Sequence, residues 1–97
     1  MPQGILVKAI NERQPVEFEY EGTRCLVNPH ILYHEERTLD IFLDGAQVTP
    51  TKKWRTFHLD SIRNINIQLT TSGFFPHPVY QLPQAGDPNI IAFVKIG

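Results

Sequence analysis

The chain has 97 residues, 41% of them hydrophobic, which is enough to form the core of one domain and too few for two. Nine basic and ten acidic residues give a net charge of −1, whereas a general nucleic-acid binder carries a clear basic excess. The single cysteine, Cys25, excludes an intrachain disulfide. Because there is no signal-peptide pattern and no apolar run long enough to span a bilayer, we expect a cytoplasmic protein without membrane contact.

A helix and a hairpin are predicted first. One face of residues 5–13 is apolar, which indicates a short helix that ends before Pro15. Residues 16–21 alternate apolar and acidic side chains, the pattern of a strand with one buried face. A turn at Glu21-Gly22 then allows residues 23–27 to return as the second strand.

Four further short strands are expected, after the second strand ends at Asn28-Pro29. We predict a loop over residues 44–53, because it holds Gly45 and Pro50. Asp60 is predicted to cap a single helical turn that follows the fifth strand. The short connections favour an antiparallel sheet closed as a small barrel or sandwich. The four predicted strands are residues 30–33, 38–43, 54–59 and 65–69.

The end of the chain differs in composition from the rest. Residues 70–86 mix prolines with Phe74, Phe75 and Tyr80, which indicates an extended tail packed on the sheet rather than a free linker. Asp87-Pro88 is a plausible start for a short helix over residues 88–96. The same run is rich in β-branched residues, so an edge strand is the alternative.

Several segments occur together in an order that resembles the WYL domain. That family shows Ala-Ile at a helix end, a strand ending in Tyr, a Val-x-Pro step and an Arg-x-Phe-Arg-Leu-Asp-x-Ile segment. The resemblance covers Leu6 to Ile67. It implies one domain with an Sm/SH3-like barrel of five to six strands over about residues 5–69 and a packed tail over 70–97. The corresponding segments here are Ala9-Ile10, Val16-Glu17-Phe18-Glu19-Tyr20, Val27-Asn28-Pro29 and Trp54-Arg55-Thr56-Phe57-His58-Leu59-Asp60-Ser61-Ile62.

The resemblance also implies a function. In family members a basic groove on the barrel senses a ligand, which in bacterial transcription factors can be single-stranded DNA or a nucleotide. This chain departs from the pattern at three places. Leu39-Asp40-Ile41 stands for Trp-Tyr-Leu, His58 for the second arginine, and Ser61 for a residue that is often arginine. Of the basic contacts, Arg55 carries over cleanly.

A basic cluster precedes and enters the fifth predicted strand. An arginine can bind phosphate bidentately, and a neighbouring aromatic side chain can stack on a base. Alternation places Arg55 on the same face as Phe57 and Leu59, at the mouth of the barrel. The alternatives are a solvated loop edge with Trp54 in the core, and ion pairs of the remaining arginines with nearby acids. The predicted ligand site comprises Arg55, Lys53, Lys52, Trp54, Tyr33, Arg24 and Arg63.

Metal and catalytic sites are not favoured. Cys25, His30 and His34 have suggestive spacing, but a structural zinc site usually needs four ligands. No nucleophile motif, phosphate loop or dinucleotide motif is present. We therefore expect no metal or cofactor, and predict a non-enzymatic module that binds a small anionic ligand, a nucleotide or short single-stranded nucleic acid. The alternative is a protein-interaction module that uses a sheet edge or the aromatic tail to bind a partner or a second copy.

Overall fold

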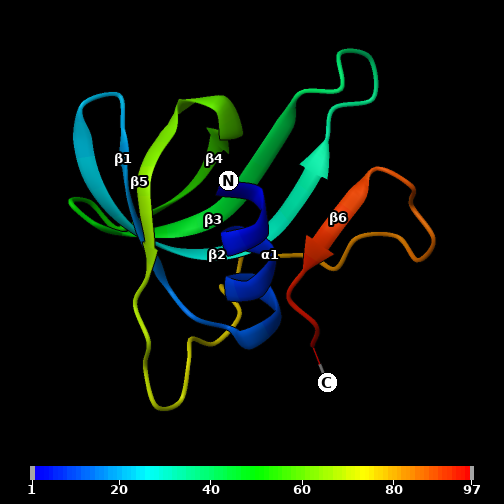
Figure 1. Ribbon diagram of the computed structural model, residues 1–97. Helices are drawn as coiled ribbons and strands as arrows, with labels where there is room; N and C mark the ends of the chain where they lie inside the picture. Colours follow the sequence, from blue (N-terminus) through cyan, green and yellow to red (C-terminus); the bar gives the residue numbers. More distant parts are fainter. Residues whose placement is uncertain (1, 97) are drawn as a thin grey trace.

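Six antiparallel strands, one α-helix and one 3-10 helix are found in residues 2–96, the part of the chain that this computed structural model describes (Figure 1). No helix in that part is long and apolar enough to cross a membrane. The elements are α1 (Pro2–Glu12), β1 (Val16–Tyr20), β2 (Thr23–His34), β3 (Ile41–Thr49), β4 (Lys53–His58), the 3-10 helix η1 (Leu59–Ser61), β5 (Ile62–Ile67) and β6 (Ile90–Phe93).

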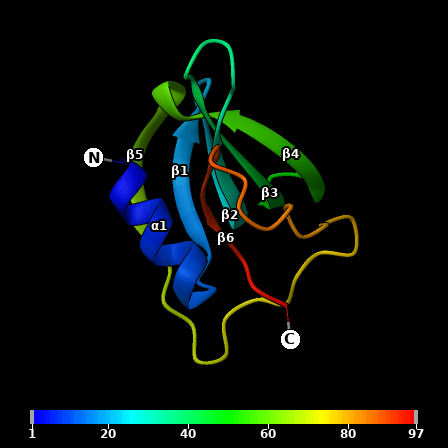
Figure 2. The same ribbon diagram turned by 90° about the vertical axis from the view of Figure 1, so that its right-hand side faces the viewer.

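The sheet is organised around β2, whose N-terminal half pairs with β1 and whose C-terminal half pairs with β6. β3 runs along its other edge, and the strand order is β4-β3-β2-β1-β5. The sheet curls strongly, as Figures 1 and 2 show. The mainly β prediction is confirmed. The predicted closure into a barrel is not complete, since no ladder joins β4 to β5 within residues 2–96 and η1 connects them instead.

Several sequence-based boundaries were wrong, and the strand predicted over residues 65–69 is β5, which spans Ile62–Ile67. β2 continues through Pro29 because a register shift lies there, and a bulge tolerates a residue without an N–H. Residues 44–49 belong to β3 rather than to a loop. The predicted strand over 38–43 begins only at Ile41, because Leu39 has a positive φ of 64° and lies in the turn. Leu39 and Asp40, which were matched to the first two residues of Trp-Tyr-Leu, therefore precede β3. The strand begins with Ile41, Phe42 and Leu43.

The last predicted element is a strand and not a helix. β6 pairs with β2, and the β-branched side chains of Ile90 and Ile91 suit this pleated edge. The N-terminal helix, the first hairpin and the single helical turn are confirmed in place.

Aromatic rings at right angles form the centre of the core. Phe18 and Phe57 lie 5.1 Å apart between ring centroids, and Tyr20 lies 5.0 Å from Phe57. Such edge-to-face pairs add to the burial of apolar area. α1 packs against β2, β5 and β6 and buries Leu6 and Ile10 in this core (Figure 2).

Two aromatic residues of the tail pack on the sheet. Phe74 and Tyr80 are buried, and the Tyr80 hydroxyl donates a hydrogen bond of 2.7 Å to the carbonyl of Val94. The N–H of Phe74 donates to the carbonyl of Arg13. Phe75 differs from its neighbour, since 84% of it is exposed.

The close contact of β3 with β2 depends on Gly45. A Cβ at this position would lie 2.7 Å from the backbone oxygen of Asn28 and 2.9 Å from a methyl group of Val27. We expect Gly45→Ala to lower the free energy of unfolding by about 1–3 kcal/mol, as overpacking typically does. Urea denaturation followed by circular dichroism measures the change.

The matched control is Gly4→Ala in α1, where an added Cβ meets nothing within 4 Å. Because alanine favours a helix over glycine by up to about 1 kcal/mol, this variant should be as stable as the parent or more stable. Equal stabilities for Gly45→Ala and the parent would show that the strands can separate slightly without cost.

Candidate functional site

Arg55 lies on the inner face of β4, next to the core. Its guanidinium carbon sits 4.8 Å from the ring centroid of Phe57 and 5.5 Å from that of Tyr20. A cation over an aromatic face is attracted by the ring quadrupole, and more so when partly desolvated. Only 27% of the Arg55 side chain is exposed. The face predicted from alternation is therefore the one that Arg55 occupies.

Two polar side chains hold the guanidinium of Arg55 from either side. Nη1 donates a 2.7 Å hydrogen bond to Oε1 of Gln47, which is buried and donates in turn to the carbonyl of Thr51. Nη2 lies 3.9 Å from Oε1 of Glu21. Because 74% of the Glu21 side chain is exposed, this ion pair is weak. Gln47 thus orients Arg55, while Glu21 is a partner that solvent or a ligand can replace.

Two lysines extend this charge into the β3–β4 turn. Lys52 and Lys53 are exposed, and no carboxylate of residues 2–96 lies within 4.0 Å of either ammonium group. A cavity of about 220 Å³ opens beside them, with Gln47 and His77 in its lining. This volume suits a phosphate or a single base, and it is below the roughly 300 Å³ at which small-molecule pockets usually begin. We call Lys52, Lys53 and Arg55 the basic turn.

Trp54 is not part of this arrangement, because alternation turns it to the other face of β4. There its ring lies 5.0 Å from His30, 5.5 Å from His77 and 6.3 Å from Tyr80. The tail therefore covers the surface predicted to stack on a base. Trp54 is partly buried in a second aromatic cluster rather than in the central core.

Tyr33 also lies away from Arg55. Its hydroxyl donates to Oδ1 of Asp44 at 3.3 Å, and Thr56 donates to the same oxygen at 2.6 Å. Burial, together with the nearby charge of Asp44, raises the pKa of Tyr33 to about 12. Thr56 shares a face with Trp54, so Tyr33 belongs to the outer side of the sheet.

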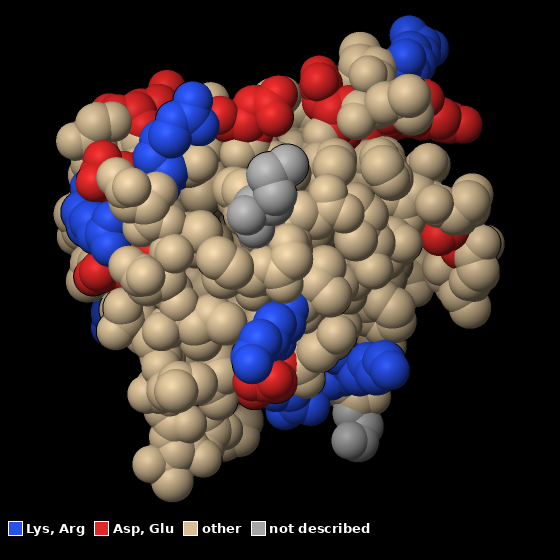
Figure 3. All heavy atoms as spheres, viewed as in Figure 1, with Lys and Arg blue, Asp and Glu red and all other residues tan. Residues whose placement is uncertain are grey.

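Arg24 and Arg63 lie on the β1–β2–β5 part of the sheet. Arg24 contacts Glu17 at 3.0 Å and Glu19 at 3.7 Å, and Arg63 donates to the carbonyls of Asp60 and Ile62. These are the contacts that the ion-pair alternative described for Arg24. Figure 3 shows basic and acidic side chains mixed at the edge and in the lower middle of one face. The seven predicted residues therefore form separate groups, of which the basic turn is one.

His30 is a structural residue that sequence reasoning considered only as a metal ligand. It is fully buried; Nδ1 donates to the carbonyl of Asn28 at 2.7 Å, and Nε2 accepts the N–H of His77 at 2.9 Å. Both ring nitrogens are thus used, and the imidazole is neutral. Burial is the main cause that lowers the pKa of His30. Its position depends on the bulge in β2, for which the local pattern gives no signal.

Cys25 shows no feature of a reactive thiol. It is buried, and this burial raises the pKa of the thiol, which keeps it protonated. His30, its possible partner in a zinc set, has both nitrogens engaged.

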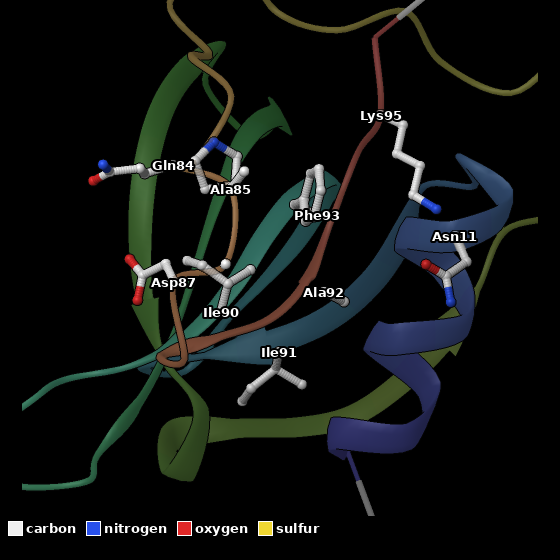
Figure 4. A pocket seen from close by; sticks show the side chains of 11 residues that line it. Asn11, Gln84, Ala85, Asp87, Ile90, Ile91, Ala92, Phe93 and Lys95 are labelled. Atoms are coloured by element: carbon white, nitrogen blue, oxygen red, sulfur yellow. The ribbon is translucent and has the colours of Figure 1, made fainter.

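A second cavity lies beside β6, and none of the basic-turn residues lines it. It has a volume of about 460 Å³ and mainly apolar walls (Figure 4). Phe93 and Ile90 lie at its centre, while Asn11, Asp87 and Lys95 add polar groups at its margins. Sequence patterns did not predict this cavity, because its walls come from three separate segments: α1, the tail and β6.

These features define a small antiparallel β domain closed by an N-terminal helix, with one ordered arginine at the edge of its core. The WYL domain model matches residues 4–67, so the chain belongs to the WYL family. WYL domains are typically non-catalytic, ligand-binding regulatory modules. The resemblance recognised from the sequence is thereby confirmed.

The structure is similar to that of proteasome accessory factor B/C (PafBC) of Arthrobacter aurescens. The TM-score is 0.67 and the sequence identity is 23%, over 82% of this chain and 13% of that chain. The likeness supports the fold, and this chain spans only a small part of that longer protein. The comparison with curated proteins gave no match.

The neutral state of His30 predicts an acid-sensitive fold. An ordinary histidine has a pKa of about 6.5, so the unfolded chain takes up a proton below that pH while folded His30 resists it. We expect the free energy of unfolding to fall as the pH drops below about 6.5, until folded His30 itself becomes protonated. Urea denaturation between pH 7.5 and pH 5 measures the slope.

His30→Gln provides the comparison. Its amide oxygen can still accept the N–H of His77, but the side chain does not titrate. The variant retains the other three histidines, so its slope should be shallower than that of the parent by the contribution of His30 alone. Identical slopes would contradict this role for His30.

Proposed function

We propose that this WYL domain binds a phosphate-bearing ligand, a nucleotide or a short single-stranded nucleic acid, at the basic turn. The observation that carries the proposal is the state of Arg55. Its guanidinium is half-buried, oriented by Gln47 and two rings, and paired only with the exposed Glu21. Because the side chain is already ordered, little further conformational entropy is lost when a ligand binds to it.

Phosphate is the chemical group that this arrangement fits best. A guanidinium presents a rigid fork of N–H donors that matches two phosphate oxygens, and a charged hydrogen bond of this kind is stronger than a neutral one. A phosphate that displaces Glu21 would keep the contact of Arg55 with Gln47. Lys52 and Lys53 would then add charge from the adjacent turn, where neither has a carboxylate partner in the described chain.

The size and charge of the site limit the ligand. The cavity beside the lysines, which Gln47 lines but Arg55 does not, holds about one base or phosphate, so a longer strand would extend over the surface. The net charge of −1 gives no long-range attraction to duplex DNA, and specificity must come from the local cluster. Stacking of a base on Trp54 would require residues 74–80 of the tail to leave it.

Anisotropy of a labelled 12-nucleotide single-stranded DNA, at 50 mM and 200 mM salt, tests the proposal. We expect Arg55→Ala to weaken binding by about 10-fold or more, since a hydrogen bond to a charged group contributes about 1.5–3 kcal/mol. The affinity of the parent should fall as salt is raised, because phosphate binding releases counterions.

Arg24→Ala is the matched control, because it removes the same group from a site where Glu17 and Glu19 already hold the guanidinium. Its affinity should remain close to that of the parent, and circular dichroism checks that both variants fold. Unchanged affinity in Arg55→Ala would refute the role of Arg55. Absence of binding to both the DNA and mononucleotides at high micromolar protein would refute a phosphate-bearing ligand.

A second candidate function is protein recognition, and the exposed apolar residues of the tail favour it. Phe75, Val79 and Leu82 are large, hydrophobic and more than half exposed. Exposed apolar groups that gather in one segment often mark an interaction surface.

Replacement of Phe75 and Leu82 by serine keeps the buried Phe74 and Tyr80 in place. If the tail mediates self-association, size-exclusion chromatography should show a larger species for the parent that dissociates in this double variant. A monomeric parent at high concentration would exclude self-association through the tail.

A further inference from the structure

Three possible metal ligands meet at the corner where β4 ends. His58 is the last residue of β4, Asp60 lies in η1, and Asp40 immediately precedes β3. One ligand atom from each lies within 4.8 Å of the others, and Nε2 of His58 is 3.7 Å from Oδ2 of Asp40. The corner is at the opposite end of β4 from the start of the basic turn, so the two sites are distinct.

The scaffold holds His58 in a fixed position. Phe42 of β3 is its cross-strand partner, and the two rings meet edge to face with centroids 5.1 Å apart. The backbone N–H of His58 donates a 2.9 Å hydrogen bond to the hydroxyl of Tyr20 in the core. The pairing with Phe42 also brings Asp40, two residues before it, beside the imidazole.

Asp60 has no structural task of its own. It was predicted to cap η1, but His58 occupies the N-cap position and no side chain makes a capping hydrogen bond, so that prediction is wrong. Arg63 binds the backbone carbonyl of Asp60 and not its carboxylate. Asp60 is exposed, and its carboxylate is free to turn toward His58.

Negative charge at this corner is poorly compensated. The hydroxyl of Thr38 lies 3.0 Å from Oδ2 of Asp40 and 2.7 Å from Oε2 of Glu35, yet its single proton can serve only one of them. No Lys or Arg nitrogen of residues 2–96 lies within 4.0 Å of the carboxylates of Asp40, Asp60 or Glu35. Acidic side chains gather along the upper rim of the face in Figure 3.

We propose that Asp40, His58 and Asp60 bind one divalent transition-metal ion, with Zn²⁺ as the best fit and a water molecule as its fourth ligand. Zinc accepts imidazole nitrogen and carboxylate oxygen at about 2.0–2.2 Å, which sets its ligand atoms about 3.4 Å apart around a tetrahedron. The ligand atoms, which lie within 4.8 Å of one another, would reach this separation through rotation of the exposed Asp60 and the partly buried Asp40 side chains. Mg²⁺ and Ca²⁺ prefer oxygen ligands alone, so the imidazole selects against them.

The consequence of binding is a clamp between two turns. Asp40 belongs to the β2–β3 connection, whereas His58 ends β4 and Asp60 lies in η1, which connects β4 to β5. An ion bound only by the folded chain stabilises it in proportion to its occupancy. Zinc would therefore tie the β2–β3 connection to the end of β4 and to η1.

The other histidines are less available to a metal. Both nitrogens of His30 are engaged, Nδ1 of His77 accepts the N–H of Val79, and Nδ1 of His34 is buried. His77→Gln is therefore a suitable control for loss of a histidine. Asp60→Asn is a suitable test variant, since Asp60 is exposed and its side chain makes no hydrogen bond recorded in residues 2–96.

The experiment is equilibrium dialysis of the tag-free full chain against Zn²⁺, with metal content measured by mass spectrometry. We expect one saturable zinc per chain at micromolar concentration, an affinity at least 10-fold lower in His58→Gln and in Asp60→Asn, and unchanged affinity in His77→Gln. Imidazole ¹⁵N spectra should show a zinc-induced shift at Nε2 of His58. The melting temperature should rise with zinc in the parent and in His77→Gln only.

Two results would overturn the proposal. One is the absence of saturable binding up to millimolar Zn²⁺. The other is parental affinity in folded Asp60→Asn and His58→Gln, which would place any bound zinc elsewhere. Neither result depends on the DNA measurements at the basic turn, so the two proposals can fail separately.

Discussion

The bulge in β2 between Pro29 and Ile31 is the constraint on which the rest of the fold depends. It allows one strand to pair with β1 over its first half and with β6 over its second, while β3 follows the opposite edge throughout. Proline suits this point because the ladder is already interrupted, and Gly45 lets β3 approach closely there. The same bulge turns His30 toward the tail while Val27 and Leu32 both remain in the core.

The alternation of side chains along β4 separates two kinds of chemistry. Arg55 and Phe57 face the core side, where a guanidinium can be oriented on aromatic rings. Trp54, Thr56 and His58 face outward, where the tail covers the first and two carboxylates flank the last. A basic site at the beginning of the strand and an acidic one at its end thus arise from six residues of regular structure.

Sequence patterns predicted those parts of the fold in which local signals agree with tertiary pairing. The acidic and apolar alternation of β1 and the Arg55–Phe57 face are such cases. Proline and glycine at positions 29 and 45 indicated breaks, because their tolerance in a strand depends on a bulge and a close contact that only the pairing creates. β6 became a strand rather than a helix because β2 offers it an edge.

The site was harder to predict than the fold. Gln47 and Glu21, which hold Arg55, come from β3 and from the turn between β1 and β2, and no sequence spacing relates the three. Arg24 was assigned to the predicted groove only because it is basic. In the structure it forms ion pairs with Glu17 and Glu19, which lie on the same face of the sheet. A charged residue can be assigned to a ligand only when its nearer partners are known.

His58 shows how a single departure from the family pattern can change the chemistry of a corner. The resemblance places an arginine there, and its permanent positive charge would balance Asp40 and Asp60 without help. An imidazole cannot offer that permanent charge, but it can offer a nitrogen lone pair, which an arginine lacks. Asp60 matches the family pattern and Asp40 does not, so with the guanidinium replaced the corner loses an internal counter-ion and gains a metal ligand, and an external cation can restore the balance.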